Sequence, residues 1–153
     1  MSQSLRTPRE HASGYPLIEA PADTLVMYCS DHRFQGAVRD FLDEELELGG
    51  NYYSLAFPGS VQILTFGEMM PKFTNSLLRP LRFILKHGGV KRIVMVAHED
   101  CQWYKTFVPL HHTVRQDAKQ QQIVDLLRVR KMLLTDKPNL EVQAYYADIL
   151  PAR

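Results

Sequence analysis

Short apolar runs that alternate with amphipathic segments constrain the fold of this chain more than any other feature. Residues 25–29 (Leu-Val-Met-Tyr-Cys) carry no charge, which is typical of a strand buried on both faces. Residues 93–96 (Ile-Val-Met-Val) are apolar and mostly β-branched, and they give the clearest strand pattern in the sequence. Two further strands are expected over residues 52–57 and 140–149.

In the segments between these runs, the apolar residues recur at the spacing of an amphipathic helix. We expect helices over residues 34–48 and 73–87, because a Gly-Gly pair follows each segment and glycine commonly ends a helix. In the second segment, Pro80 marks either the start of the helix or a kink. A longer helix is expected over residues 117–134, whereas residues 60–72 show no clear period. Five residues should lie along one side of the long helix: Ile123, Leu126, Leu127, Arg130 and Leu134.

The order of these elements predicts an α/β fold. Strands that alternate with helices are joined by right-handed crossovers, so we expect a three-layer sandwich with a mainly parallel sheet of about four strands. A chain of 153 residues has the size of one domain. We place that domain at residues 23–153, behind a polar N-terminal arm at residues 1–22.

Composition argues against several classes of protein and partner. A chain with 45% hydrophobic and 23% charged residues is not expected to be disordered. A formal net charge of +1, without a basic stripe, argues against nucleic acid or an anionic membrane as the partner. We see neither an export signal nor an apolar span of about 20 residues. We therefore expect a soluble, cytoplasmic protein whose thiols are reduced.

The two cysteines are too few for a disulfide framework, but each follows a predicted strand. Cys29 ends the first strand, and His98 and Cys101 come just after the third. Ligands of open α/β sheets bind outside the carboxyl ends of the strands, and the topology can place these two ends side by side. Two thiols and an imidazole form a three-ligand set for zinc, which leaves the fourth position for water or substrate. A redox pair of thiols would leave His98 unexplained.

Asp31 and Arg33 follow the first cysteine closely. An aspartate two residues from a ligand can bind the metal itself or accept a proton from metal-bound water. The guanidinium of Arg33 can fork onto the Asp31 carboxylate, hold it off the metal and lower its pKa. Asp31 can also cap the helix that starts near Phe34, and the two roles are compatible.

Cys29-x-Asp31-x-Arg33 and His98-x-x-Cys101 resemble the two halves of the β-class carbonic anhydrase motif. The resemblance covers the chain from about residue 24 onward and includes two further segments, residues 88–98 and 140–149. It implies that Cys29, His98 and Cys101 hold one zinc ion per chain and that Asp31 and Arg33 form a gating dyad. The implied reaction is the reversible hydration of carbon dioxide to bicarbonate by zinc-bound hydroxide, in a homodimer or a higher homo-oligomer.

Two segments depart from the family's pattern. The family usually has Arg-Asn-Ala-Gly-Asn after the second strand, where residues 56–60 of this chain are Ala-Phe-Pro-Gly-Ser. The residue after the last zinc cysteine is normally glycine, and here Gln102 and Trp103 follow, so we expect an altered or narrower pocket. Trp103, Tyr104 and Phe107 either wall this pocket or belong to a core or interface cluster.

Alternative functions follow from these departures. One is a noncatalytic zinc scaffold in which Asp31 completes the tetrahedron. Another is a hydrolase that acts on a sulfur analogue of carbon dioxide. A nucleotide-binding domain is disfavoured, because the sequence has no glycine-rich phosphate loop.

Overall fold

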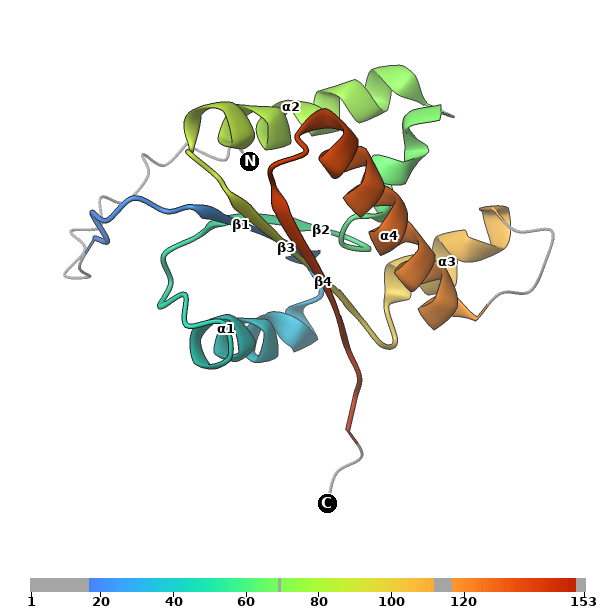
Figure 1. Cartoon of the computed structure of the whole chain (residues 1–153). Helices are drawn as coiled ribbons and strands as arrows, with labels where there is room; N and C mark the ends of the chain where they lie inside the picture. The colour runs from blue at the N-terminus through green and yellow to red at the C-terminus, as the bar shows by residue number, and fades with distance from the viewer. Residues whose placement is uncertain (1–16, 69, 112–116, 151–153) are drawn as a thin grey trace, which may run out of the picture.

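The computed structural model describes residues 17–68, 70–111 and 117–150. Within them four strands form one sheet in the order β2-β1-β3-β4, and every neighbouring pair is parallel (Figure 1). The strands are β1 (Thr24–Cys29), β2 (Tyr53–Phe57), β3 (Arg92–His98) and β4 (Glu141–Ala147). The predicted four-stranded parallel sheet is thus confirmed. Of the predicted N-terminal arm, residues 1–16 lie outside the described part of the chain, and residues 17–22 contain neither helix nor strand.

Helices cover both faces of the sheet (Figure 1). Helix α1 (Gln35–Glu44) lies on one face, whereas α2 (Pro71–His87) and α4 (Ala118–Asp136) lie on the other. Helix α3 (Gln102–His111) follows β3 and contacts α4. Among the described residues, no helix is long and apolar enough to cross a membrane.

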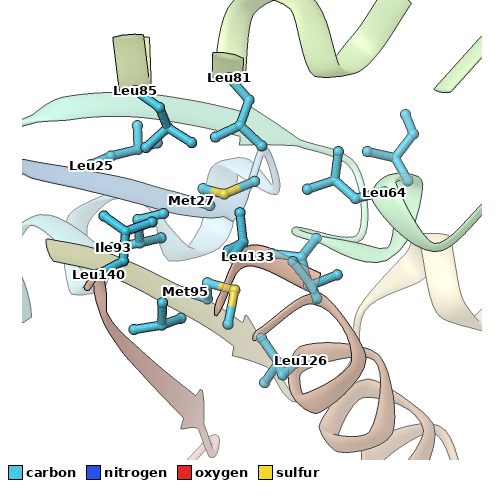
Figure 2. Packing of buried hydrophobic residues seen from close by; sticks show 14 of the residues in the cluster. Leu25, Met27, Leu64, Leu81, Leu85, Ile93, Met95, Leu126, Leu133 and Leu140 are labelled. Atoms are coloured by element: carbon cyan, nitrogen blue, oxygen red, sulfur yellow. The ribbon is translucent and has the colours of Figure 1, made fainter. Parts of the chain in front are cut away.

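Alternate residues of the central strands face the two helical layers. Met27, Ile93 and Met95 belong to the core beneath α2 and α4 (Figure 2), whereas Val26 and Val94 pack in the cluster on the α1 side. All five side chains are fully buried. Burial on both faces explains why β1 and β3 are continuous apolar runs rather than alternating ones.

The direction of the chain across the sheet reverses between β1 and β3. Strand β2 pairs with one side of β1, and β3 then returns to pair with the other side. In this register Tyr28 lies opposite Val96, so Cys29 and His98 leave the sheet at the ends of neighbouring strands. Such a reversal point is where open α/β sheets form their binding crevice.

Helix α1 is shorter than the helix predicted over residues 34–48. A 3₁₀ turn, His32–Phe34, precedes it, and the chain leaves the helix after Glu44. Glu47 has a φ of 54°, in the left-handed region, so a right-handed helix does not continue through it. The predicted helix was therefore wrong in its last turn.

Helix α2 contains Pro80 in its interior and begins at Pro71, in the first turn, where proline is well tolerated. The alternative that this helix starts at Pro80 was wrong. The stretch without a clear period contains a second 3₁₀ helix, Gln62–Glu68. No helix was predicted over the residues of α3, so this helix is a finding of the structure.

The buried face of α4 differs from the predicted stripe. Leu126 is 3% exposed, but Leu127 is 56% exposed and Ile123 is 38% exposed. The buried side instead includes three polar residues, Gln121, Gln122 and Asp125. The stripe was predicted from side-chain polarity, whereas these polar groups are buried because hydrogen bonds satisfy them.

We predict that truncation of two neighbouring leucines of α4 changes the free energy of unfolding by very different amounts. Leu126→Ala should lower the free energy of unfolding by about 2–5 kcal/mol, because it opens a cavity in the core. Leu127→Ala, on the exposed side, should change it by no more than about 0.5 kcal/mol. Urea unfolding followed by circular dichroism measures both variants, and equal losses would contradict this placement of α4.

Candidate metal centre

Three side chains with metal-binding atoms converge at the reversal point of the sheet. Cys29 is the last residue of β1, His98 is the last residue of β3, and Cys101 lies directly before α3. All three are buried, and their ligand atoms lie within 4.8 Å of one another. The two Sγ atoms are 3.9 Å apart. The predicted ligands are thus brought together, and they could hold a metal ion.

The imidazole of His98 has a defined tautomer. Its Nδ1 lies 2.7 Å from the carbonyl oxygen of Glu99, and a carbonyl only accepts, so Nδ1 carries the proton. Nε2 is buried and has no hydrogen-bond partner among the described residues. Phe34 stacks on the ring with a centroid distance of 3.9 Å and helps to fix its orientation. A buried acceptor without a partner is costly unless a ligand engages it, and metal-binding histidines show this same arrangement.

The two thiols are hydrogen-bonded to each other. A hydrogen bond from the Cys101 thiol holds the pKa of Cys29 well below the usual range of a thiol, and the neighbouring His98 imidazole acts in the same direction. The same contact with Cys29, together with burial, raises the pKa of Cys101. The thiolate is the form that binds metals. One of the two sulfurs is therefore prepared as a ligand, and a bound cation would displace the proton of the other.

Asp31 and Arg33 form a tight pair in the loop after β1. The guanidinium donates from Nε and Nη2 to the two carboxylate oxygens of Asp31, with a shortest distance of 2.7 Å. These bonds hold the pKa of Asp31 well below its usual range. Asp31 also caps the 3₁₀ turn that follows, because its Oδ1 accepts from the backbone N–H of Arg33 at 3.0 Å. The cap and the ion pair, weighed as alternatives from the sequence, occur together.

Asp100 is a residue of the centre that the sequence did not reveal. It lies between His98 and Cys101 and was treated only as part of the spacing. Arg33 reaches it with two bonds, from Nη1 to Oδ2 at 2.9 Å and from Nη2 to the backbone carbonyl at 3.0 Å. Lys105 forms an ion pair with the other carboxylate oxygen of Asp100. A lone aspartate in a spacer carries little signal, because its partner is 67 residues away.

A pocket of about 340 Å³ opens onto the centre. Its lining includes Cys29, Asp31, Arg33 and Cys101, and the remaining wall is formed by Ser30, His32, Pro58, Gln102 and Trp103. Asp31 and Arg33 therefore face the same space as the two thiols.

The two segments that depart from the β-class pattern pack against each other in this wall. Gly59 has a φ of 76°, and a Cβ atom at this position would overlap the indole ring of Trp103. The indole N–H donates to Oε1 of Gln62, which is buried in the 3₁₀ helix after β2. The glycine retained at position 59 thus makes room for the tryptophan that follows the last ligand.

Trp103 and Tyr104 take different places. Trp103 lines the pocket, whereas Tyr104 is buried against the two thiols. The Tyr104 hydroxyl donates to Oδ2 of Asp125 on α4 at 2.8 Å, and Gln121 donates to the other oxygen at 3.0 Å. Burial raises the pKa of Tyr104. The aromatic pair therefore divides into a pocket wall and a core anchor.

A larger hollow of about 610 Å³ lies between α2 and α4. Leu81, Leu85 and Leu133 are among its lining residues, and neither a thiol nor an imidazole lines it. Size alone does not locate the chemistry here. The smaller pocket holds the groups that can bind a metal or move a proton.

Comparison with models of known protein families and with curated proteins finds no match to this chain. What the centre can do is therefore inferred from its own residues and geometry.

We predict that the chain binds one Zn²⁺ and that His98 is required. His98→Ala should weaken Zn²⁺ binding by more than about 100-fold, beyond the loss typical of residues that only support a ligand. His87→Ala is the matched control, because His87 is an exposed residue at the end of α2, and should leave binding unchanged. Competition with a chromophoric chelator measures the affinity. Equal affinities for the two variants would remove His98 from the centre.

We also predict that Gly59 is required for the position of Trp103. Gly59→Ala should destabilise the fold by about 1–3 kcal/mol, because it combines a left-handed backbone with an overlap. Gly36→Ala in α1, where a Cβ meets nothing within 4 Å, should be neutral or stabilise by up to about 1 kcal/mol. Urea unfolding gives the stability, and the emission of the single tryptophan reports its environment. An unchanged emission and stability in Gly59→Ala would contradict this packing.

Proposed function

We propose that this centre binds zinc and catalyses the reversible hydration of carbon dioxide, as the resemblance to β-class carbonic anhydrases implies. The observation that carries the proposal is the arrangement of Asp31 and Arg33. They line the same pocket as the two thiols and are paired with each other. Because Asp31 is bonded to Arg33, the metal would have three protein ligands, Cys29, His98 and Cys101, and one coordination position would stay open for a small molecule.

The donor set supports zinc as the metal. Zinc prefers thiolate and imidazole ligands in a tetrahedron with bonds of about 2.3 Å to sulfur, which puts two sulfurs about 3.8 Å apart. The Sγ atoms of Cys29 and Cys101 are 3.9 Å apart before any rearrangement. Two thiolates balance the charge of a dication, and the unpartnered Nε2 of His98 supplies the neutral third ligand.

The pairing of Asp31 favours a catalytic centre over a closed scaffold. A scaffold of this kind needs Asp31 as the fourth ligand, yet both oxygens of its carboxylate accept bonds from Arg33. An open fourth position is the feature that distinguishes catalytic zinc sites from structural ones.

Bound zinc would supply a water ligand of lowered pKa, which provides a nucleophile near neutral pH. Asp31 stays ionised because Arg33 depresses its pKa, so its carboxylate serves as a hydrogen-bond acceptor in the pocket and orients the attacking group. Arg33 keeps this carboxylate in place. Pro58 and Trp103 give the pocket an apolar wall, which suits a small, uncharged substrate.

A second candidate substrate is a sulfur analogue of carbon dioxide. The apolar surfaces of Pro58 and Trp103 favour it, because sulfur is larger and more polarisable than oxygen. The same metal centre and the same Asp31 would serve both reactions, and the assay below includes both substrates.

We predict that the zinc-loaded protein accelerates carbon dioxide hydration in a stopped-flow assay, with a rate that rises with pH as the metal-bound water ionises. Arg33→Ala should lower the zinc-normalised rate by about 10- to 100-fold, because Asp31 is then free to occupy the open position. Arg39→Ala is the control, since Arg39 is exposed and forms its ion pair with the neighbouring Asp40.

Three outcomes separate the candidates. Background rates with carbon dioxide but turnover of carbonyl sulfide would move the assignment to the sulfur analogue. Background rates with both substrates, in a protein with one zinc per chain, would leave the scaffold. An unchanged rate in Arg33→Ala would remove the Asp31–Arg33 pair from the mechanism.

A further inference from the structure

The guanidinium of Arg33 lies between two carboxylates that come from different loops. One side of it bonds Asp31, in the loop after β1. The other side bonds Asp100, in the loop after β3, through both the side chain and the backbone carbonyl. Charge-assisted bonds of this forked kind are stronger and more directional than neutral hydrogen bonds. Arg33 is thus fixed by two anchors.

The second anchor is itself held in place. Asp100 has a φ of 59°, a left-handed conformation that aspartate tolerates better than most residues. On its N-terminal side the N–H of Glu99 donates to the carbonyl of Ala147 at 2.9 Å, and on its C-terminal side Cys101 begins the turn into α3. The Lys105 ammonium occupies the carboxylate oxygen that Arg33 does not use.

Without the bonds to Asp100, Arg33 could move away from Asp31 and leave its carboxylate unpaired beside the metal position. The Arg33 side chain is 40% exposed and would be free to turn toward solvent, whereas Asp31 is only 11% exposed and lies in the pocket. A carboxylate released next to a metal cation with an open position is a strong competitor for that position. The contacts that hold Arg33 in place therefore also prevent Asp31 from moving from Arg33 to the metal.

We infer that Asp100 is a positioning residue that clamps Arg33 and thereby keeps Asp31 off the metal. The inference rests on the proposed function for the existence of an open metal position. It extends the gating pair to three members, in which Asp100 never contacts the metal or the substrate. It also assigns a role to the spacer between His98 and Cys101.

The test uses the Co²⁺-substituted chain of 153 residues and thiocyanate as a probe of the open position. Visible absorption of the cobalt centre follows thiocyanate binding directly and does not depend on turnover. Asp100→Ala should raise the apparent Kd for thiocyanate by about tenfold, because Asp31 then competes for the metal. Lys105→Met is the matched control. It removes the other ion pair of Asp100 but leaves the bonds to Arg33, and it should change the Kd by less than about twofold.

A double variant shows whether the effect runs through Asp31. In Asp31→Asn/Asp100→Ala the amide is a poor metal ligand that still caps the turn, so thiocyanate affinity should return to that of Asp31→Asn alone. If Asp100→Ala fails to fold, Asp100→Asn keeps one acceptor for Arg33 without the charge and should show a smaller loss in the same direction.

The inference is overturned if Asp100→Ala or Asp100→Asn binds thiocyanate as tightly as the unmodified chain. It is also overturned if the double variant remains weak, since the loss would then not arise from Asp31. Its failure is distinguishable from failure of the proposed function. Thiocyanate access that depends on Asp100 in a protein inactive toward carbon dioxide would refute only the activity, and an active protein indifferent to Asp100 would refute only the clamp.

Discussion

The parallel pairing of β1 with β3 is the constraint on which the candidate metal centre depends. Because β2 lies on the other side of β1, the chain reverses its direction across the sheet at this pair, and the carboxyl ends of two strands flank one crevice. Cys29 and His98 are the last residues of those strands, so their separation is set by the register of the sheet. The buried side chains of Met27 and Met95 hold that register from within the core. The candidate ligands therefore take their geometry from the packing of the sheet.

The sequence was informative about the fold where burial and polarity agree. Strands β1 and β3 are buried on both faces, so each is a continuous apolar run, a pattern typical of the inner strands of a parallel sheet. The helix α4 was predicted, but its buried face was not, because burial and polarity disagree there. Gln122 and Asp125 are buried because the backbone of His98 and the hydroxyl of Tyr104 satisfy them. Those partners are distant in sequence, so the spacing of residues within α4 could not predict these hydrogen bonds.

The same distinction applies to the centre. The candidate ligands and the Asp31–Arg33 pair were predictable because the residues that cooperate lie two or three positions apart, within two short motifs. Asp100 was missed because its partner Arg33 belongs to the other motif. The contact of Gly59 with Trp103 was missed for a similar reason, although the departures in the two segments that contain these residues were visible. A departure from the family pattern indicates that the pocket is altered, but its structural effect depends on which residue packs against it from the other side of the pocket.

A single guanidinium links the arrangement of the two loops to access at the metal position. Arg33 bonds carboxylates from both loops, so any movement that draws the loops apart also loosens its hold on Asp31. A carboxylate freed in this way lies next to the centre and would close it. If Asp100 clamps Arg33 as we infer, opening of the loops and closing of the coordination position would be one event, and substitutions that loosen the loop after β3 would act on access before they act on the candidate ligands. The charges that matter for this protein are local ones, which is why a formal net charge of +1 says little about its chemistry.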